Sequence, residues 1–402
     1  MGLFDRLSGR RARDRFAARV MAAVEARGWR GEVDYDPAGF QIGLGGGRLR
    51  LAEPFSDFRR GVGRGRERVV AALAELALQV AEPPATLAEA APRLRPELRR
   101  LIHIGDAWVG AAPWEAAAAR RGVYQRVTGG LAAMAVLDHG AASRPVTDDD
   151  LTRWRAGLFD VLDAALANLR AAGGPSGLHR TPAGYWASRW ADGCDAARLL
   201  LPDLVKALPL KGTPLAVPLA RDCLLVAGLD DAPAIAALVQ RAERRLRRPA
   251  GLLSAVPLTL TPGGWRPYEG RDADDPLARL AHRARLRDWS DQAALLKANM
   301  PAGLEAAYVC EVEGDTANGR LVTRATLAPD ASNFVPLVDQ LLVAGGGRRP
   351  VIRSLSQVAA AVERPLYRVD RAEPPRLVIM QPFDDQTWGR MFEPPSVGPH
   401  AG

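Results

Sequence analysis

The residues best suited to chemistry in this sequence lie in one short polar segment, WADGCDAAR, at residues 190–198. Asp192, Asp195 and Arg198 follow one another at intervals of three residues, and the thiol of Cys194 stands between them. Carboxylates and a guanidinium gathered at the start of a helix can bind a small charged ligand. The same residues can instead hold the fold, with Asp192 supporting the turn, Asp195 capping the helix and Arg198 pairing with a carboxylate. We favour this structural interpretation.

A second charged pair, Arg221–Asp222, lies where two apolar runs meet, TPLAVPLA and DCLLVAGL, which we expect to be strands. Asp230–Asp231 follows the second run and is expected to cap a helix over residues 233–247. A binding or active site would require Arg221 or Asp222 to converge with the 192–198 turn in one concave pocket. The candidate ligand-binding residues are therefore Asp192, Asp195, Arg198, Arg221 and Asp222.

Familiar catalytic and metal-binding patterns do not occur. The sequence has neither GxSxG nor HExxH, and the glycine-rich GVGRGRE at 61–67 fits no nucleotide-binding pattern. Of the scattered histidines, His103 lies three residues before Asp106 as a candidate proton-transfer pair, on which we place no weight. The cysteines form no CxxC pair, so we expect free thiols in a reducing cytoplasm, and neither a metal nor a cofactor. They are Cys194, Cys223 and Cys310.

Composition indicates a soluble globular protein. The chain has 402 residues, of which 48% are hydrophobic and 25% charged, enough for two or three domains. The net charge of +8 is compatible with a nucleic acid or an anionic membrane, but acidic residues are interleaved in most places and no nucleic-acid-binding motif occurs. The chain has no signal-peptide pattern and no apolar run of about 20 residues, so we expect a cytoplasmic location.

The opening segment is the one place where a membrane or nucleic acid is a candidate partner. An apolar cluster precedes a basic run, in the order Leu3, Phe4, Leu7, Arg10, Arg11 and Arg13. Such a segment can lie on an anionic surface as an interfacial helix. The spacing of Phe16, Val20 and Val24 instead predicts a helix that ends near Gly28 and packs on the domain behind a frayed basic start. We favour the packed helix.

Hydrophobic periodicity predicts the elements that must position these residues. Strands are expected at 32–36, 40–44, 48–52, within 99–113, at 131–138, 185–191, 213–220 and 222–229, in a hairpin around Pro262–Gly264, and at 304–313, 319–327 and 376–380. Helices are expected at 66–80, 148–171, 194–208, 233–247, 288–299 and 354–363. Thr147 should cap the second helix, and Pro202 should kink or divide the third.

Three segments in a fixed order carry a resemblance to a known family: WADGCDAARLLLPDL, VPLARDCLLVAGLDD and SAVPLTLTPGGWRPY. They resemble the YtpQ family, bacterial proteins without an established activity, in which a D-G-x-D-A-S-R-L-like turn precedes an R-D-x-L-like strand and a P-L-x-L-x-x-x-G-W hairpin. Here Cys194 replaces the family's usual aromatic residue and Ala197 its serine. The later stretch from DQAALL to YVCEVEG resembles the extension of longer members. The resemblance covers most of the chain, is strongest over 185–268, and implies no catalytic residue.

We therefore expect an α+β fold with mixed sheets and packed helices in two units. Residues 1–280 form the larger unit, either whole or split near residue 100, and residues 281–393 form a smaller α/β unit before a loose tail. The favoured function is a non-enzymatic protein-binding or adaptor module, because the well-patterned fold lacks a catalytic constellation. The alternatives are an enzyme or ligand binder using the 192–198 turn, and membrane or nucleic-acid association through the N-terminus.

Overall fold

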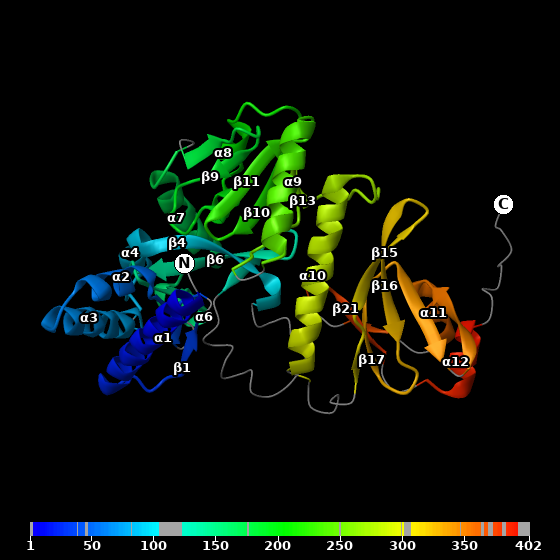
Figure 1. The fold of residues 1–402 in the computed structure, drawn as a ribbon, viewed down its shortest axis with the longest axis horizontal. Helices are drawn as coiled ribbons and strands as arrows, with labels where there is room; N and C mark the ends of the chain where they lie inside the picture. The colour runs from blue at the N-terminus through cyan, green and yellow to red at the C-terminus, as the bar shows by residue number, and fades with distance from the viewer. Residues whose placement is uncertain are drawn as a thin grey trace.

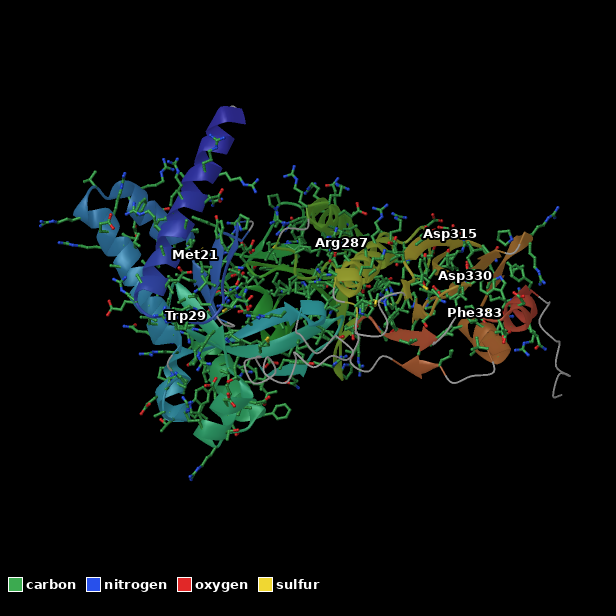
Figure 2. The ribbon with its side chains drawn as sticks, turned by 90° about the horizontal axis from the view of Figure 1, so that it is seen from below. Met21, Trp29, Arg287, Asp315, Asp330 and Phe383 are labelled. Carbon is green, nitrogen blue, oxygen red and sulfur yellow. The ribbon has the colours of Figure 1, made fainter. Side chains whose placement is uncertain are left out.

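Helices and β-sheets alternate along the chain, and the fold is α+β as expected. The computed structural model describes residues 3–392 except for 38, 45–46, 82, 104–122, 175–176, 249–250, 299, 301–306, 346, 363–365, 369–372 and 380–382. Figure 1 shows the N-terminal helices at one end, the long helix α10 (Pro276–Ala298) in the middle and the last strands at the other end. Figure 2 gives the same order from below, from Met21 through Arg287 to Phe383.

The first sheet is antiparallel, in the order β1-β2-β3-β7-β6-β4 with β5 beside β6. Its strands are β1 (Val33–Asp36), β2 (Gln41–Leu44), β3 (Gly47–Arg50), β4 (Leu94–Arg100), β5 (Tyr124–Arg126), β6 (Leu131–Asp138) and β7 (Ala142–Pro145). Strands from both sides of residue 100 therefore pair within one sheet. The strand predicted at 131–138 is confirmed and almost completely buried.

Three helices lie at the β1–β3 end of this sheet: α1 (Leu3–Ala26), α2 (Ala52–Arg60) and α3 (Arg64–Ala81). Phe16, Val20 and Val24 are buried between them and the sheet, which confirms the face predicted from their spacing. The expected frayed start is wrong, because the helix begins at Leu3 and its basic run is helical. Arg13 stacks over the Phe40 ring at 4.4 Å, so part of that basic run packs on the domain.

The second sheet is also antiparallel, in the order β13-β12-β10-β11-β9-β8. Its strands are β8 (Leu178–Arg180), β9 (Trp186–Ser188), β10 (Pro214–Ala220), β11 (Cys223–Gly228), β12 (Leu258–Thr261) and β13 (Gly264–Pro267). The predicted strands on either side of Arg221–Asp222 and the hairpin around Pro262–Gly264 are confirmed. Helix α9 (Ala232–Leu246) packs on β10 and β11, and Asp231 caps it through the Ala234 N–H at 3.3 Å.

Two predicted helices are divided. The helix expected at 148–171 is α6 (Asp148–Trp154) followed by α7 (Leu158–Ala171), because Arg155 adopts a left-handed φ of 51° that ends the first. Thr147 caps α6 in a capping box with Asp150, as predicted. The helix expected at 194–208 becomes the 3₁₀ helix η4 (Ala196–Leu200) and α8 (Pro202–Lys206), separated at Pro202.

Short elements surround β4. They are α4 (Leu87–Ala90), η1 (Ala91–Arg93) and η2 (Leu101–His103). Of the stretch 99–113, where a strand was expected, Arg99 and Arg100 end β4, residues 101–103 form η2, and residues 104–113 lie outside the described residues. The side chain of His103 and all of Asp106 also lie outside them, so their pairing is not addressed by the structure.

The C-terminal strands form two small sheets, each with one parallel pair. One sheet has the order β14-β17-β21-β20, and the other has the order β15-β16-β18-β19. Their strands are β14 (Tyr308–Val309), β15 (Val312–Ala317), β16 (Arg320–Leu327), β17 (Asn333–Pro336), β18 (Gln340–Gly345), β19 (Arg348–Arg353), β20 (Tyr367–Arg368) and β21 (Arg376–Ile379). Two helices complete this part, α11 (Leu355–Val362) and α12 (Asp385–Phe392).

Helix α10 connects the two parts of the molecule. Leu277 and Leu280, near its start, belong to the large core that the first two sheets share. Leu296, near its end, packs with Phe334 of β17. The charged run that suggested a boundary near 270–290 is largely the first half of this helix, and the limit expected at residue 280 falls inside it.

Candidate functional site

The WADGCDAAR turn is closed by its own side chains. Asp192 accepts hydrogen bonds from Arg198 on both oxygens, at 3.0 and 2.7 Å, and from the Cys194 N–H at 2.9 Å. Arg198 is completely buried, and its guanidinium carbon lies 4.0 Å from the Trp190 ring centroid. Burial opposes ionisation of Asp192, but the bonds from Arg198 and Cys194 lower its pKa overall. The two charges thus neutralise each other inside the turn. Gly193, with a φ of 71°, lets the backbone turn here.

Asp195 does not make the capping bond expected of it. It stands at the N-cap position of η4, but its side chain accepts no bond from the helix. The carboxyl is completely buried, and burial raises its pKa. Asp195 therefore lies in the interior beside Ser188 of β9, and a ligand would not reach it directly.

Arg221 and Asp222 form the turn between β10 and β11, and they point to different places. Arg221 donates from Nε to the Gly193 carbonyl at 2.7 Å, so it does reach the 192–198 turn. Asp222 is exposed and lines a groove beside Cys223 and α9. Of the five predicted residues, only Asp222 lines any of the cavities described below.

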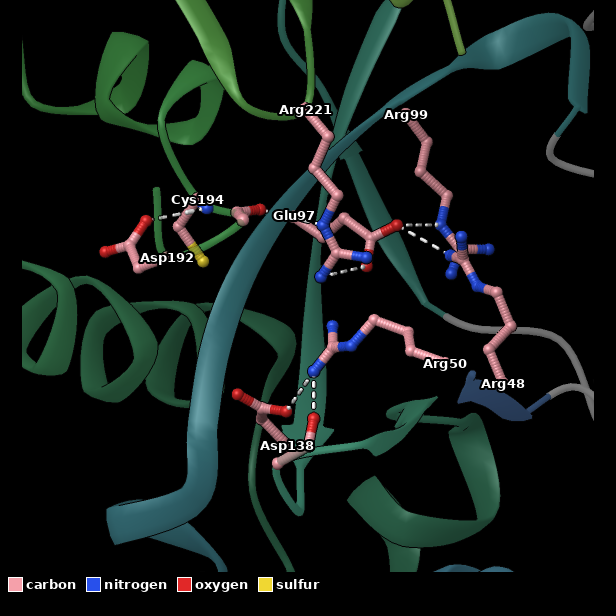
Figure 3. A network of polar contacts seen from close by, with 10 residues as sticks. Arg48, Arg50, Glu97, Arg99, Asp138, Asp192, Cys194 and Arg221 are labelled. Atoms are coloured by element: carbon pink, nitrogen blue, oxygen red, sulfur yellow. Dashed lines mark hydrogen bonds and ion pairs between the residues drawn. The ribbon is translucent and has the colours of Figure 1, made fainter. Parts of the chain in front are cut away.

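Arg221 also joins a buried network around Glu97, which Figure 3 shows. Glu97 is only 4% exposed on β4 and accepts bonds on Oε1 from Arg48 of β3 at 2.6 Å and from Arg99 at 2.8 Å. Its other oxygen, Oε2, lies 3.5 Å from Nη2 of Arg221. Burial alone would raise the pKa of Glu97, but the three arginines lower it to about 2. The network connects the first sheet to the second. Its arginines are paired with Glu97 and are therefore not available to a ligand.

The three cysteines are free, as expected. Burial raises the pKa of Cys194 to about 11 and that of Cys310 to about 12. Burial also raises the pKa of the half-buried Cys223. Because the thiolate is the nucleophilic form, these side chains are protonated and unreactive at neutral pH.

A cavity of about 370 Å³ lies where the first two sheets meet α10 and the C-terminal strands. Its volume is that of a small-molecule site. The polar side chains that line it include Arg100 of β4 and, from α10, His282, Arg285 and Asp288. Apolar side chains supply another part of the wall, among them Leu131, Leu253, Val256 and Trp289. This mixture of charge and apolar surface is typical of a ligand pocket.

The polar residues of α10 face the cavity together because His282, Arg285 and Asp288 recur every third residue along the helix. Asp288 pairs with Arg100 at 2.7 Å, but Arg100 also pairs with Asp291 at 2.7 Å. Burial raises the pKa of Asp288 to about 6, although Arg100 opposes this shift. Asp288 therefore exchanges its proton close to neutral pH, unlike Glu97.

Arg285 is the least compensated cation of the cavity wall. Its Nη2 donates to the Tyr268 carbonyl at 2.9 Å. Within the described residues no carboxylate lies within 4.0 Å of its guanidinium. Burial lowers the pKa of Arg285, yet a guanidinium stays charged at neutral pH. Arg285 is half-buried, and a partly desolvated cation without a paired anion is costly, so an anion that entered the cavity would be stabilised here.

His282 completes the polar side of the cavity. Burial lowers its pKa, so its imidazole is neutral at pH 7. Its Nε2 is buried and has no hydrogen-bond partner among the described residues. A Cβ at position 314 would come within 2.5 Å of this nitrogen, so Gly314 of β15 permits the close packing. His282 therefore lines the cavity as a neutral side chain whose Nε2 is turned against Gly314 and is closed to a ligand.

The sequence does contain a signal for this cavity, namely charged residues at helical spacing within the run DDPLARLAHRARLRDW. Its leucines and alanines recur at the same spacing on an adjacent side, so the run is a helix with a buried apolar face beside a half-buried polar one. The other lining residues come from segments far away in the sequence, around residues 100, 254, 323 and 374. No local pattern connects these segments.

Within the part of the chain that the structure describes, no cluster of three or more His, Cys, Asp or Glu side chains is suited to a metal ion. In the same residues, no helix combines the length and apolarity needed to cross a bilayer.

Comparisons of this chain with models of protein families, with curated proteins and with solved structures find no match. The resemblance to the YtpQ family therefore stays a prediction, and only the geometry of the chain itself bears on its function.

Proposed function

We propose that the protein binds a small organic anion in the cavity beside α10. The observation that carries this proposal is the position of Arg285 on the wall of a cavity of about 370 Å³. No described carboxylate lies within 4.0 Å of the Arg285 guanidinium. Arginine binds carboxylates and phosphates in a two-pronged geometry, which gives both affinity and orientation.

The walls of the cavity favour a carboxylate with an apolar body. Trp289, Leu131 and Val256 add apolar surface to the cavity wall. Arg100 is engaged by Asp288 and Asp291, and Arg271, which also lines the cavity, is engaged by Asp339 at 2.5 Å. Among the described lining residues, Arg285 is therefore the cation that remains for the ligand.

Asp288 makes this binding depend on pH. Above its pKa of about 6, an ionised Asp288 repels an incoming anion. Below that pKa it is neutral, whereas a carboxylate ligand with an ordinary pKa stays charged. Affinity should therefore rise as the pH falls from 7.5 toward 5.5.

Calorimetric titration with benzoate tests the proposal, with benzyl alcohol as the uncharged counterpart. Arg285→Leu should weaken benzoate binding about tenfold or more, because the charge-assisted hydrogen bonds are lost. The matched control is Arg170→Leu, since Arg170 is exposed on α7 and lines none of the cavities described here. The proposal fails if benzoate, butyrate and inorganic phosphate all do not bind, or if both variants bind benzoate equally well.

The protein-binding role expected from the sequence stays a prediction. A second protein would have to be recognised on the outer surface, whereas the cavity offers a defined volume with defined charges. A pull-down of tagged protein from its native host addresses that role separately.

A further inference from the structure

Apart from the central cavity, we propose that a groove at the C-terminal end of α9 binds a small molecule carrying several phosphate groups. The groove has a volume of about 940 Å³. Its charged lining residues are Arg241, Arg244, Arg245, Arg247, Arg248 and Asp222. Within the described lining, five cations therefore face one carboxylate across a space large enough for a ligand.

The sequence explains why these arginines gather. Arg241, Arg244 and Arg245 lie in the last turns of α9 at helical spacing, and Arg247 and Arg248 follow directly after its end at Leu246. The earlier turns of the helix bury Ile235, Leu238 and Val239 against β10 and β11. The turn at Asp222 brings the second wall of the groove to the same place.

The contacts within the protein leave most of this positive charge uncompensated. Arg244 donates to Gln240 at 3.1 Å, and Arg241 lies beside the Cys223 thiol and the Tyr185 hydroxyl. Among the described residues, no carboxylate lies within 4.0 Å of Arg241, Arg244, Arg247 or Arg248.

A helix C-terminus favours cations, but that effect explains only part of the cluster. Arg245 donates to the Arg248 carbonyl at 2.6 Å, which is the capping contact expected of a basic residue here. One or two arginines suffice for this purpose. Further arginines repel one another, and a ligand with several negative charges would relieve the repulsion.

The lining also indicates which anion fits. The planar guanidinium matches phosphate oxygens in a two-pronged contact, and several arginines call for several phosphates. Among the described residues that line the groove none is aromatic, so these residues offer the bases of a nucleic acid no surface to stack on. The groove is therefore better suited to clustered phosphates than to a nucleic acid strand.

Inorganic tripolyphosphate is the probe, titrated calorimetrically into the full chain at about 50 mM and about 300 mM salt. The double variant R244Q/R247Q should weaken its binding about tenfold, because both side chains are exposed contacts of the groove. The control R64Q/R68Q removes the same charge from exposed positions on α3 and should change binding less than about twofold. Asp222→Asn should tighten binding about twofold to threefold, since it removes the one carboxylate in the lining.

The proposal is overturned if tripolyphosphate does not bind, or if the two double variants weaken it equally, which would indicate general attraction to a basic protein. It is also overturned if a single-stranded oligonucleotide displaces tripolyphosphate and binds more tightly. Vesicles with and without a phosphoinositide bisphosphate then tell whether the phosphates are presented by a lipid or by a free molecule. Binding that survives R285L separates this groove from the central cavity.

Discussion

Two carboxylates, the buried Glu97 and the half-buried Asp288, have opposite properties although both pair with arginine. Glu97 is surrounded by Arg48, Arg99 and Arg221, and its pKa falls to about 2. Asp288 has Arg100 alone, and Arg100 also serves Asp291, so burial prevails and the pKa rises to about 6. The ratio of cations to anions around a carboxylate in the protein interior decides whether the fold stabilises its ionised or its protonated form.

The difference in pKa distinguishes the structural network around Glu97 from the cavity around Asp288, which can respond to a ligand. Around Glu97 the ion pairs connect two sheets, and a ligand could bind these charges only by breaking the ion pairs. Around Asp288 the polar groups line an open volume, and Arg285 retains capacity for a new partner. Four substitutions test this contrast, from the largest expected effect to the smallest.

Glu97→Gln should destabilise the protein by about 3 kcal/mol at pH 7, because it leaves three arginines facing each other without a charge partner. The free energy of unfolding in urea measures the effect. The folded pKa of about 2 lies below the ordinary 4.5, so the wild-type stabilisation is complete above pH 4.5 and is lost as the pH falls toward 2. The variant should lack that pH dependence. Glu75→Gln, on an exposed position of α3, is the control; a cost below about 1 kcal/mol for Glu97→Gln would contradict a structural role.

Asp192→Ala should cost about 2 kcal/mol, since the fully buried Arg198 would lose its two-pronged partner. Binding of benzoate and of tripolyphosphate should stay unchanged, because Asp192 lines neither cavity. Thermal or urea unfolding measures the first effect, and titration measures the second. Asp203→Ala, at an exposed position in α8, should be close to neutral. A variant of normal stability that has lost ligand binding would make the 192–198 turn a binding site after all.

Asp288→Asn should stabilise the free protein by about 1 kcal/mol at pH 7, in contrast to Glu97→Gln. The folded pKa of about 6 lies above the ordinary 3.8, so ionised Asp288 costs stability increasingly as the pH rises from 3.8 to 6. The gain should disappear below pH 3.8. Unfolding in urea at several pH values measures it, with the exposed Asp330→Asn as the control. A loss of stability at pH 7 would show that the pair with Arg100 outweighs burial.

Arg50→Gln should change stability by less than about 1 kcal/mol. Arg50 pairs with Asp138 at 3.0 Å next to the Glu97 network, as Figure 3 shows, but both side chains are about one-third exposed, at 35% and 30%. Solvent screens such a pair. A cost comparable to that of Glu97→Gln, measured by the same urea titration, would mean that the network extends to this pair.

The local parts of the fold could be predicted from the sequence. The spacing of Phe16, Val20 and Val24 predicts the buried face of α1, and Thr147 predicts the start of α6. The places where helices stop were harder to predict. Arg155 interrupts the run 148–171, which has helical periodicity on both sides of it. Arginine is a good helix former, so its residue type does not predict the left-handed backbone found there.

The sequence by itself determined the α+β class, most strands and helices, and the structural role of Asp192 and Arg198, because these depend on residues near one another in the chain. Only the tertiary structure decided that Arg221 reaches Glu97, that Asp288 shares its arginine, and that Arg285 faces a cavity. These facts depend on residues that lie far apart in sequence, and burial changes the energy of a charge only once the segments have come together.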